Sequence, residues 1–271
     1  MPTKLSYSSM NTYERCPLAY RLQYEERVPT KRSSFLAFGD SLHQALYRFH
    51  DRPVPVAPPV EHLLEILDDV WVSEGYGGEA EEHAYRQHAR EVLRRYHEDN
   101  AASYRIPAAL EFRFRIEVEG VPVNGVIDRL DRVPGGGYEI VDYKTNRRLP
   151  PKASIDRDLQ LSLYALAARE VWGIEPERLT LYYLLPGQRM TTSRSADDLD
   201  DLRGRIANVA ERIDAGKFEP RENALCGHCE FQHLCPLFRH KFERELSPPR
   251  VGEIVEEWIR LKREHQERWR R

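Results

Sequence analysis

The stretch from Gly125 to Lys144 most constrains how this chain can fold. It holds two short apolar runs, which lead to Asp128 and to Asp142 and are separated by a segment with one proline and three glycines. Runs of this kind, bounded by turn residues, are typical of neighbouring β-strands. Because residues two apart in a strand share a face, Asp142 and Lys144 project together, and two adjacent strands would bring the two aspartates together. The sequence therefore predicts paired carboxylates with a lysine beside them.

The rest of the chain predicts an α/β fold. Apolar and charged residues alternate from Leu110 to Glu119, which indicates a strand with one buried face. We expect strands at 109–118, 122–132, 137–143 and 178–185, a loop leading into a helix at 35–50, and helices at 60–73, 79–100, 155–171 and 196–215. This order suggests a mixed central sheet with helices packed on it. Residues 52–105 are predicted to be a helical insertion that covers one side of the core.

The composition limits the classes of function. Of the 271 residues, 41% are hydrophobic and 31% charged, which leaves enough apolar material for a folded core. The net charge of −3 gives no evidence for a nucleic-acid partner, so any DNA contact must come from a local basic surface. No apolar run approaches the roughly 20 residues that a membrane span requires, and the N-terminus lacks the apolar centre of a signal peptide. We therefore expect a cytoplasmic protein with no membrane partner.

The paired carboxylates suggest a cation site. Two close carboxylates repel each other, so they normally bind a cation or share a proton. A divalent ion held by Asp128, Asp142 and a backbone carbonyl would suit Mg²⁺ or Mn²⁺. Lys144 would then orient the attacking water and stabilise the charge that builds on a phosphate. For an isolated Asp-x-Lys, however, the ordinary interpretation is a salt bridge at a strand end. A lone histidine such as His43, beside the apolar face of its helix, is usually structural.

The joint order of four motifs changes this interpretation. They are Gly39-x-x-x-His43, Gly125-x-x-Asp128, Asp142-x-Lys144 and Gln160-x-x-x-Tyr164. Together they resemble the PD-(D/E)xK nuclease superfamily, and specifically its RecB-like branch, over almost the whole chain. The resemblance implies a restriction-endonuclease-like core, in which a mixed sheet flanked by helices carries a metal-dependent nuclease site.

The resemblance also implies a role for each site residue. The catalytic residues that it implies are Asp128, Asp142, Lys144, Gln160 and Tyr164. The metal ligands that it implies are His43, Asp128, Asp142 and the backbone carbonyl of Tyr143. Lys144 would assist hydrolysis, whereas Gln160 and Tyr164 would position the DNA strand. Glu111 stands where such enzymes often have an acidic residue.

The four cysteines have the spacing of a second metal site. Cys226, Cys229 and Cys235 are close in the sequence, and Cys16 is near the N-terminus. In a reducing cytosol such cysteines bind metal more often than they form disulfides. Four thiolates suit tetrahedral zinc, and spacing alone does not separate zinc from an iron–sulfur cluster. The arrangement resembles the 4Fe–4S site of AddB-type nucleases and of the CRISPR-associated adaptation nuclease, which implies a structural cluster that joins the two ends of the chain.

The resemblance implies a stand-alone, Mg²⁺- or Mn²⁺-dependent DNA exonuclease that acts on single-stranded DNA or DNA ends in repair, recombination or defence. The alternatives are a nuclease subunit of a helicase–nuclease or CRISPR adaptation complex, with a helicase or integrase partner, and a non-catalytic DNA-binding protein of the same fold. The chain has no Gly-x-x-x-x-Gly-Lys-Ser/Thr phosphate loop, so a helicase motor would come from a partner. Residues 1–246 are predicted to form the nuclease domain. Residues 247–271 are predicted to form a basic helix that contacts DNA or a partner, or packs on the domain.

Overall fold

The computed structural model describes residues 3–243 of the chain together with Glu256 and Arg260. The chain divides into two compact units. They comprise residues 1–11 with 30–216, and residues 12–29 with 217–271. The predicted basic helix at 247–271 lies outside the described residues except for Glu256 and Arg260. In the part of the chain that the structure describes, no helix is both long and apolar enough to span a membrane.

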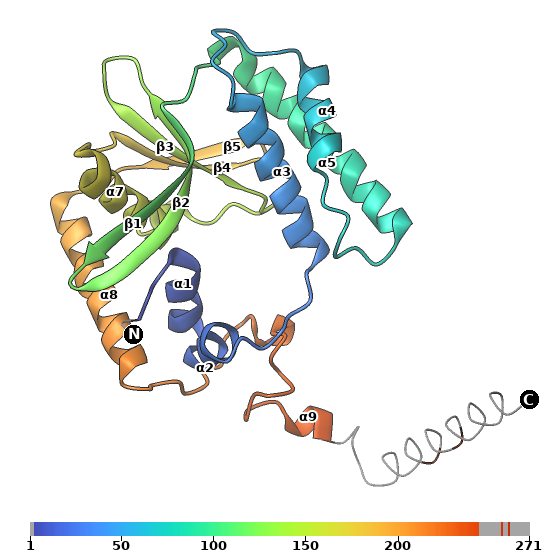
Figure 1. Cartoon of the computed structure of the whole chain (residues 1–271), viewed down its shortest axis with the longest axis vertical. Coiled ribbons are helices and arrows are strands. Elements are labelled where there is room, and N and C mark those ends of the chain that lie inside the picture. Colours follow the sequence, from blue (N-terminus) through green and yellow to red (C-terminus); the bar gives the residue numbers. More distant parts are fainter. Residues whose placement is uncertain (1–2, 244–255, 257–259, 261–271) are drawn as a thin grey trace, which may run out of the picture. The chain divides into compact units, whose positions relative to one another are not determined.

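A five-stranded mixed sheet forms the centre of the larger unit (Figure 1), and its strands lie in chain order. The strands are β1 (Ala109–Val118), β2 (Val121–Arg132), β3 (Tyr138–Lys144), β4 (Arg178–Tyr183) and β5 (Gln188–Thr192). Strands β3 and β4 are parallel, and the other neighbours are antiparallel. The predicted mixed α/β sheet is therefore confirmed. Strand β5 was not predicted, because its short, polar sequence lacks the apolar alternation of a strand with a buried face.

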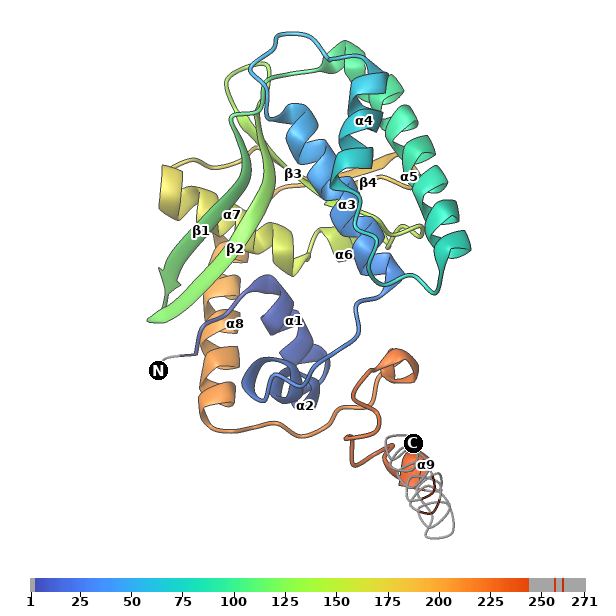
Figure 2. The same ribbon diagram turned by 45° about the vertical axis from the view of Figure 1, so that its right-hand side comes forward.

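Helices cover both faces of this sheet. The helices of the larger unit are α1 (Tyr7–Arg15, which continues into the smaller unit), α3 (Ser34–His50), α4 (Val60–Val70), α5 (Glu79–Asn100), η2 (Ala101–Ser103), α6 (Lys152–Ile155), α7 (Leu159–Trp172) and α8 (Ala196–Asp214). Figures 1 and 2 show α7 and α8 on one face of the sheet and α3, α4 and α5 on the other. Helix α7 connects the parallel strands β3 and β4, as a parallel pair requires. Apolar side chains of α3, α4 and α5 form a core with Val141 and Tyr143 of β3.

Helix α3 starts earlier than the sequence suggested. It begins at Ser34, where a loop was expected, because the Ser33 hydroxyl accepts a hydrogen bond from the Leu36 amide at 3.4 Å and caps the first turn. Gly39 therefore lies inside the helix. A Cβ atom there would lie 3.4 Å from Thr145 Oγ1, so glycine lets α3 pass close to the end of β3. One turn later, His43 is placed beside the end of that strand.

Gly125 keeps room for an aromatic ring beside the predicted carboxylates. A Cβ atom on Gly125 would lie 2.6 Å from Phe114 Cζ on the neighbouring strand β1, which is far inside contact distance. The Phe114 ring lies against Tyr164 of α7 in an edge-to-face arrangement. The glycine of Gly125-x-x-Asp128 thus permits β1, β2 and α7 to pack together at this point.

The smaller unit combines the end of α1 with residues from the C-terminal part of the chain. Its other helices are α2 (Pro17–Tyr20), η1 (Arg21–Glu25), η3 (Cys226–His228) and α9 (His240–Glu243). Pro17 occupies the first turn of α2, where its missing N–H costs no helical hydrogen bond. Ala19, Leu22 and Phe231 form a small apolar core. The Tyr13 hydroxyl donates to the Lys217 carbonyl at 2.8 Å, which fastens α1 to the C-terminal segment.

Candidate active site

Four of the predicted site residues form a closed ring of three hydrogen bonds and one ion pair. Asp142 and Lys144 share a face of β3, and Lys144 Nζ lies 2.6 Å from Asp142 Oδ2. Lys144 Nζ also donates to Gln160 Oε1 at 2.5 Å, and Gln160 Nε2 donates to the Tyr164 hydroxyl at 2.6 Å. Tyr164 closes the ring by donating to Asp142 Oδ1 at 3.1 Å. The Asp142 carboxylate is 2% exposed, so the ring holds a buried charge in a fixed position.

The start of α7 sets the geometry of this ring. Asp158 caps the helix by accepting from the Leu161 amide at 2.9 Å, so that Gln160 and Tyr164 lie in the first turns, one turn apart on the same face. The helix ends at Gly173, which adopts a left-handed conformation with φ of 65°. Local capping and helical spacing therefore direct both side chains at the end of β3.

A second group of side chains lies beside the ring. The Nδ1 atom of His43 lies 3.3 Å from Asp128 Oδ2, and the same oxygen accepts a hydrogen bond from the Tyr143 amide at 2.9 Å. One ligand atom each from His43, Glu111 and Asp128 lies within 4.8 Å of the others. Asp142 is not part of this group; its carboxylate forms an ion pair with Lys144 and accepts a hydrogen bond from Tyr164. Among the described residues, this group is the candidate metal site.

Glu111 enters the group through an unusual backbone conformation. It has φ of 44°, although it lies within β1 and opposite Asp128, between the pairs Leu110–Arg129 and Phe112–Ile127. A non-glycine residue with positive φ is strained, and such strain concentrates at functional sites. The alternating pattern had placed Glu111 on the solvated side with the arginines of β1. Only the resemblance to the nuclease family pointed to it, since the sequence pattern carries no sign of the irregular backbone.

Burial and negative charge dominate the electrostatics of the site. Burial, reinforced by the charge of Asp142, raises the pKa of Asp128 well above its usual value. Burial also raises the pKa of Glu111. It lowers the pKa of His43, although the Asp142 charge and a backbone hydrogen bond with Tyr143 act in the opposite direction. The negative charges of these carboxyl groups lie close together and repel one another, which disfavours their ionised forms. A bound divalent cation would offset this repulsion.

Lys144 stays charged within this environment. Burial alone would lower its pKa, but the adjacent Asp142 carboxylate, through its charge and its hydrogen bond, raises the pKa above the usual range. The side chain can therefore donate hydrogen bonds and stabilise negative charge, but it does not act as a base near neutral pH. The carboxylate oxygens of Glu111 and Asp128 are the kind of ligand that Mg²⁺ and Mn²⁺ prefer, and the His43 imidazole adds a nitrogen donor, so the donor set fits a divalent ion.

The candidate metal ligands line an open cavity of about 640 Å³. Arg48 and Arg113 supply positive charge to its wall. Phe35 and Leu36, at the start of α3, also line it, and they are 47% and 55% exposed. Both side chains are therefore accessible to a ligand in the cavity.

The four cysteines line one cavity of about 260 Å³ in the smaller unit. Backbone amides approach two of the sulfurs: Arg221 N donates to Cys16 Sγ at 3.5 Å, and Asn223 N donates to Cys226 Sγ at 3.3 Å. Among the described residues, however, no three of these sulfurs lie within 4.8 Å of one another. Tetrahedral zinc with bonds of about 2.3 Å requires sulfurs about 3.8 Å apart. The sulfurs are thus not arranged as zinc ligands, and no bound cluster is shown.

Comparisons with known proteins identify the family and the fold of the chain. Over 86% of the chain, it is 26% identical to the Gene 69 protein of Mycobacterium phage L5 and 25% identical to that of Mycobacterium phage D29, covering 96% and 97% of those proteins. The crystal structure of a proposed exonuclease from Eubacterium rectale matches with a TM-score of 0.53 and 14% identity, over 88% of this chain and 87% of that one, which shows a shared fold. The family model of the PD-(D/E)XK nuclease superfamily matches residues 4–236. The chain therefore belongs to the PD-(D/E)XK nuclease superfamily.

Proposed function

We propose that this protein is a metal-dependent deoxyribonuclease of the RecB-like branch, which hydrolyses single-stranded DNA or DNA ends in repair, recombination or defence. The observation that carries the proposal is the group of His43, Glu111 and Asp128 ligand atoms beside the buried Asp142–Lys144 pair. A structural salt bridge at a strand end would not require a histidine and a strained glutamate as neighbours. In this proposal residues 1–246 form the nuclease domain.

The proposed chemistry divides between a bound ion and the residues of the chain. His43, Glu111 and Asp128 would hold the ion, with Asp142 and the Tyr143 carbonyl next to them. A divalent ion at such a site polarises a phosphate and lowers the pKa of water. Lys144 donates hydrogen bonds to the phosphate oxygens or to the attacking water and stabilises the charge that develops.

Gln160 and Tyr164 act on Lys144 in this proposal. Gln160 accepts from the Lys144 ammonium, and Tyr164 holds the Asp142 carboxylate that attracts it. The two side chains thereby restrict the ammonium to one position. A flexible lysine would lose most of this benefit, because transition-state stabilisation depends on donors that are already in place.

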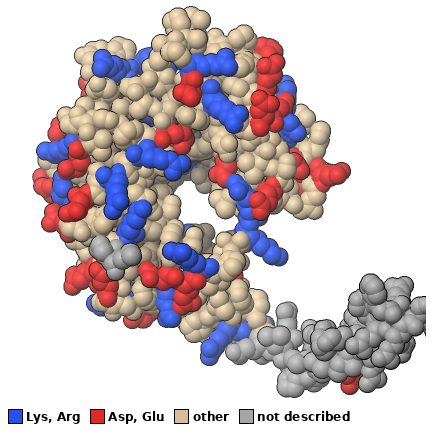
Figure 3. Space-filling model, in the orientation of Figure 1, with Lys and Arg blue, Asp and Glu red and all other residues tan. Residues whose placement is uncertain are grey.

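The preference for unpaired DNA is supported by the wall of the 640 Å³ cavity. Phe35 is half exposed there, and every unpaired base offers a flat face that can stack on such a ring. Arg48 and Arg113 line the same cavity and would pair with the DNA backbone. Figure 3 shows Lys and Arg side chains interspersed with Asp and Glu side chains on the face in view. Because the net charge of the chain is −3, the positive charge that contacts DNA would come from these two arginines at the cavity.

The proposal includes a structural 4Fe–4S cluster held by Cys16, Cys226, Cys229 and Cys235. Support comes from their shared cavity and from the two backbone amides that donate to Cys16 and Cys226, since N–H donors stabilise thiolate sulfurs. Iron, sulfide and zinc analysis of anaerobically purified protein tests the assignment. Stoichiometric zinc without iron would contradict it. We expect Cys226→Ala to lower the melting temperature, and an unchanged melting temperature together with full activity would exclude the structural role.

A cleavage assay tests the nuclease proposal. Single-stranded DNA labelled at the 5′ or the 3′ end is incubated with anaerobically purified protein and Mg²⁺, Mn²⁺ or EDTA. We expect cleavage with a divalent ion, none with EDTA, and a loss of at least about 100-fold in Lys144→Met. Lys152→Met is the matched control, because this exposed lysine of α6 pairs only with Asp156 among the described residues.

Two results of the cleavage assay would contradict the proposal, and each would lead to a different conclusion. Full cleavage by Lys144→Met, free of contaminating nuclease, would refute the assigned site. No cleavage by protein that is loaded with metal and cluster would favour the alternative of a subunit that requires a helicase or integrase partner. Co-purification with such a partner, and activity restored by adding it, would then establish that alternative.

A further inference from the structure

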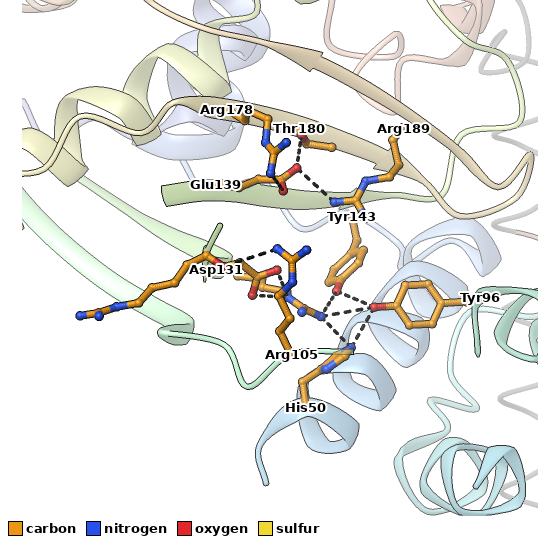
Figure 4. Close-up of polar contacts among 11 residues, drawn as sticks. His50, Tyr96, Arg105, Asp131, Glu139, Tyr143, Arg178, Thr180 and Arg189 are labelled. Carbon is orange, nitrogen blue, oxygen red and sulfur yellow. Dashed lines mark hydrogen bonds and ion pairs between the residues drawn. The ribbon is translucent and has the colours of Figure 1, made fainter. Parts of the chain in front are cut away.

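A second cavity, of about 290 Å³, lies on the opposite face of β3 from Asp142 and Lys144. Because side chains alternate along a strand, Glu139, Val141 and Tyr143 face this cavity. The paired positions of β4 carry Arg178, Thr180 and Tyr182. Figure 4 shows the polar side chains that meet there from the sheet and from helices α3 and α5. The face is unusually polar for the interior side of a sheet, and none of these side chains has a part in the proposed hydrolysis.

Arg129 is the buried cation of this cavity. The residue is 8% exposed, and its Nε atom donates to both oxygens of Asp131 at 2.8 and 2.9 Å. Its Nη1 atom lies 2.8 Å from His50 Nε2 and 3.4 to 3.5 Å from the hydroxyls of Tyr143 and Tyr96. Within residues 3–243, no hydrogen bond is formed by its Nη2 atom. The guanidinium is therefore held rigidly while one of its nitrogens stays available.

The rest of the wall leaves an excess of positive charge. Glu139 is neutralised by Arg189 at 3.1 Å and Arg178 at 3.4 Å, and it accepts from the Thr180 hydroxyl at 2.7 Å. Arg105 reaches only the Arg132 carbonyl, at 3.5 Å, among the described residues. Four arginines thus line the cavity with two carboxylates, Asp131 and Glu139.

His50 does not change this balance. Burial and the neighbouring Arg129 lower its pKa to about 2, so the ring is neutral near neutral pH. Since Arg129 Nη1 can only donate, His50 Nε2 is an acceptor and the ring proton lies on Nδ1. The described part of the cavity wall therefore carries two uncompensated positive charges.

We propose that this cavity binds a phosphate group, either as free inorganic phosphate or as the phosphomonoester of a mononucleotide. A phosphate dianion would neutralise the two excess charges. Its oxygens would accept from Arg129 Nη2 and from the Arg105 fork, the geometry in which guanidinium groups bind phosphate. The cavity lies at the lower limit of volumes for ligand sites, so it suits a small anion rather than a polymer.

A bound phosphate would also be coupled to the nuclease site. Arg129 directly follows Asp128, and the Tyr143 amide donates to Asp128 while its hydroxyl contacts Arg129. Fixing Arg129 therefore restricts the strand segment that carries Asp128. This proposal does not depend on the nuclease function, because phosphate binding is measured without any DNA cleavage.

Calorimetric titration tests the site. The full chain, freed of divalent metal with EDTA, is titrated with inorganic phosphate and separately with deoxyadenosine monophosphate, at a constant ionic strength set with NaCl. We expect saturable binding of one equivalent and at least a tenfold weaker affinity in Arg105→Ala. Arg115→Ala is the control, because this exposed arginine of β1 lies outside the cavity. The tighter of the two ligands identifies the natural source of the phosphate group.

Two further measurements keep the test decisive. Circular dichroism checks that Arg105→Ala is folded, and Arg105→Gln replaces it if it is not. Lys144→Met should bind phosphate as the unmodified protein does, because Lys144 lies on the other face of β3. Equal affinity in the Arg105 variants and in the unmodified protein would overturn the proposal, as would binding that disappears in Lys144→Met.

Discussion

Replacing Tyr164 with phenylalanine should weaken both the fold and the activity. The hydroxyl of this buried residue donates to Asp142 Oδ1 at 3.1 Å and accepts from Gln160 Nε2 at 2.6 Å. A hydrogen bond to a charged group contributes about 1.5 to 3 kcal/mol. Gln160 is only half buried, so water can replace its lost acceptor, whereas the buried Asp142 oxygen is left without its donor. The expected loss of stability is therefore about 2 kcal/mol.

This loss corresponds to a readily measured change. In a unit of this size, 1 kcal/mol shifts the melting temperature by about 2 to 4 °C, so Tyr164→Phe should melt about 4 to 8 °C lower. Its kcat on single-stranded DNA should also fall, because Asp142 and Lys144 are no longer fixed by the ring. Thermal unfolding followed by circular dichroism and the end-label assay measure the two effects.

The matched control is Tyr85→Phe on α5. The Tyr85 side chain is partly buried, and its hydroxyl makes no hydrogen bond within the part of the chain that the structure describes. This variant should keep its melting temperature and its kcat. If Tyr164→Phe behaves like the control in both assays, the hydrogen-bonded ring has neither of the roles that we assign to it.

Three other substitutions test separate parts of the structure. Gly125→Ala should cost about 1 to 3 kcal/mol in urea unfolding, because its Cβ would lie 2.6 Å from Phe114 Cζ, and an unchanged midpoint would refute this packing. Phe35→Ala should weaken binding of single-stranded DNA by about 1 to 3 kcal/mol, an effect that should vanish when the stacked base is abasic. The pKa of His50 is about 2 in the folded protein, against an ordinary value of 6.5. Its contribution to stability is therefore complete above pH 6.5 and is lost as the pH falls, because the unfolded chain then binds a proton that the folded protein does not. By pH 5 the loss is about 2 kcal/mol, and melting temperatures from pH 7 to 5 should fall less steeply in His50→Gln.

The sequence predicted those parts of the site that depend on regular secondary structure. Asp142 and Lys144 share a face because strand side chains alternate, and Gln160 and Tyr164 share a face because they lie one helical turn apart. The structure brings the two pairs together, which the spacing alone did not predict and the resemblance to the nuclease family implied. The antiparallel pairing of β2 with β3 likewise places Asp128 next to Asp142.

The sequence could not predict features that tertiary contacts decide. The early start of α3 depends on a capping serine, and the passage of Gly39 beside Thr145 is not visible in a pattern of apolar residues. Strand β5 is polar and short, and it exists because β4 offers it a partner. The cavity around Arg129 combines side chains from four strands (β2 to β5) and from helices α3, α5 and η2, so no local sequence motif predicts it. Each of these features depends on contacts between distant segments.

Glu111 allows a test of whether its strained backbone conformation persists because the candidate metal site requires its carboxylate. Its φ of 44° costs about 1 to 2 kcal/mol in a residue other than glycine, and its carboxylate lies in the candidate metal site. Glycine adopts positive φ freely but loses more chain entropy on folding, so Glu111→Gly should gain up to about 1 kcal/mol in metal-free protein. It should melt about 2 to 4 °C higher without metal and bind Mn²⁺ more weakly in calorimetry.

The chain contains a matched control for this trade of stability against metal binding. Glu119 has φ of 50° in the tight turn between β1 and β2, next to Gly120, where no candidate ligand lies. Glu119→Gly should therefore raise the melting temperature in the same way and leave Mn²⁺ binding unchanged. If Glu111→Gly binds Mn²⁺ as tightly as Glu119→Gly does, the strain at Glu111 does not exist to place a metal ligand. Stabilisation in both variants, with weaker Mn²⁺ binding only in Glu111→Gly, would show that this strand tolerates an unfavourable conformation because the site requires its carboxylate.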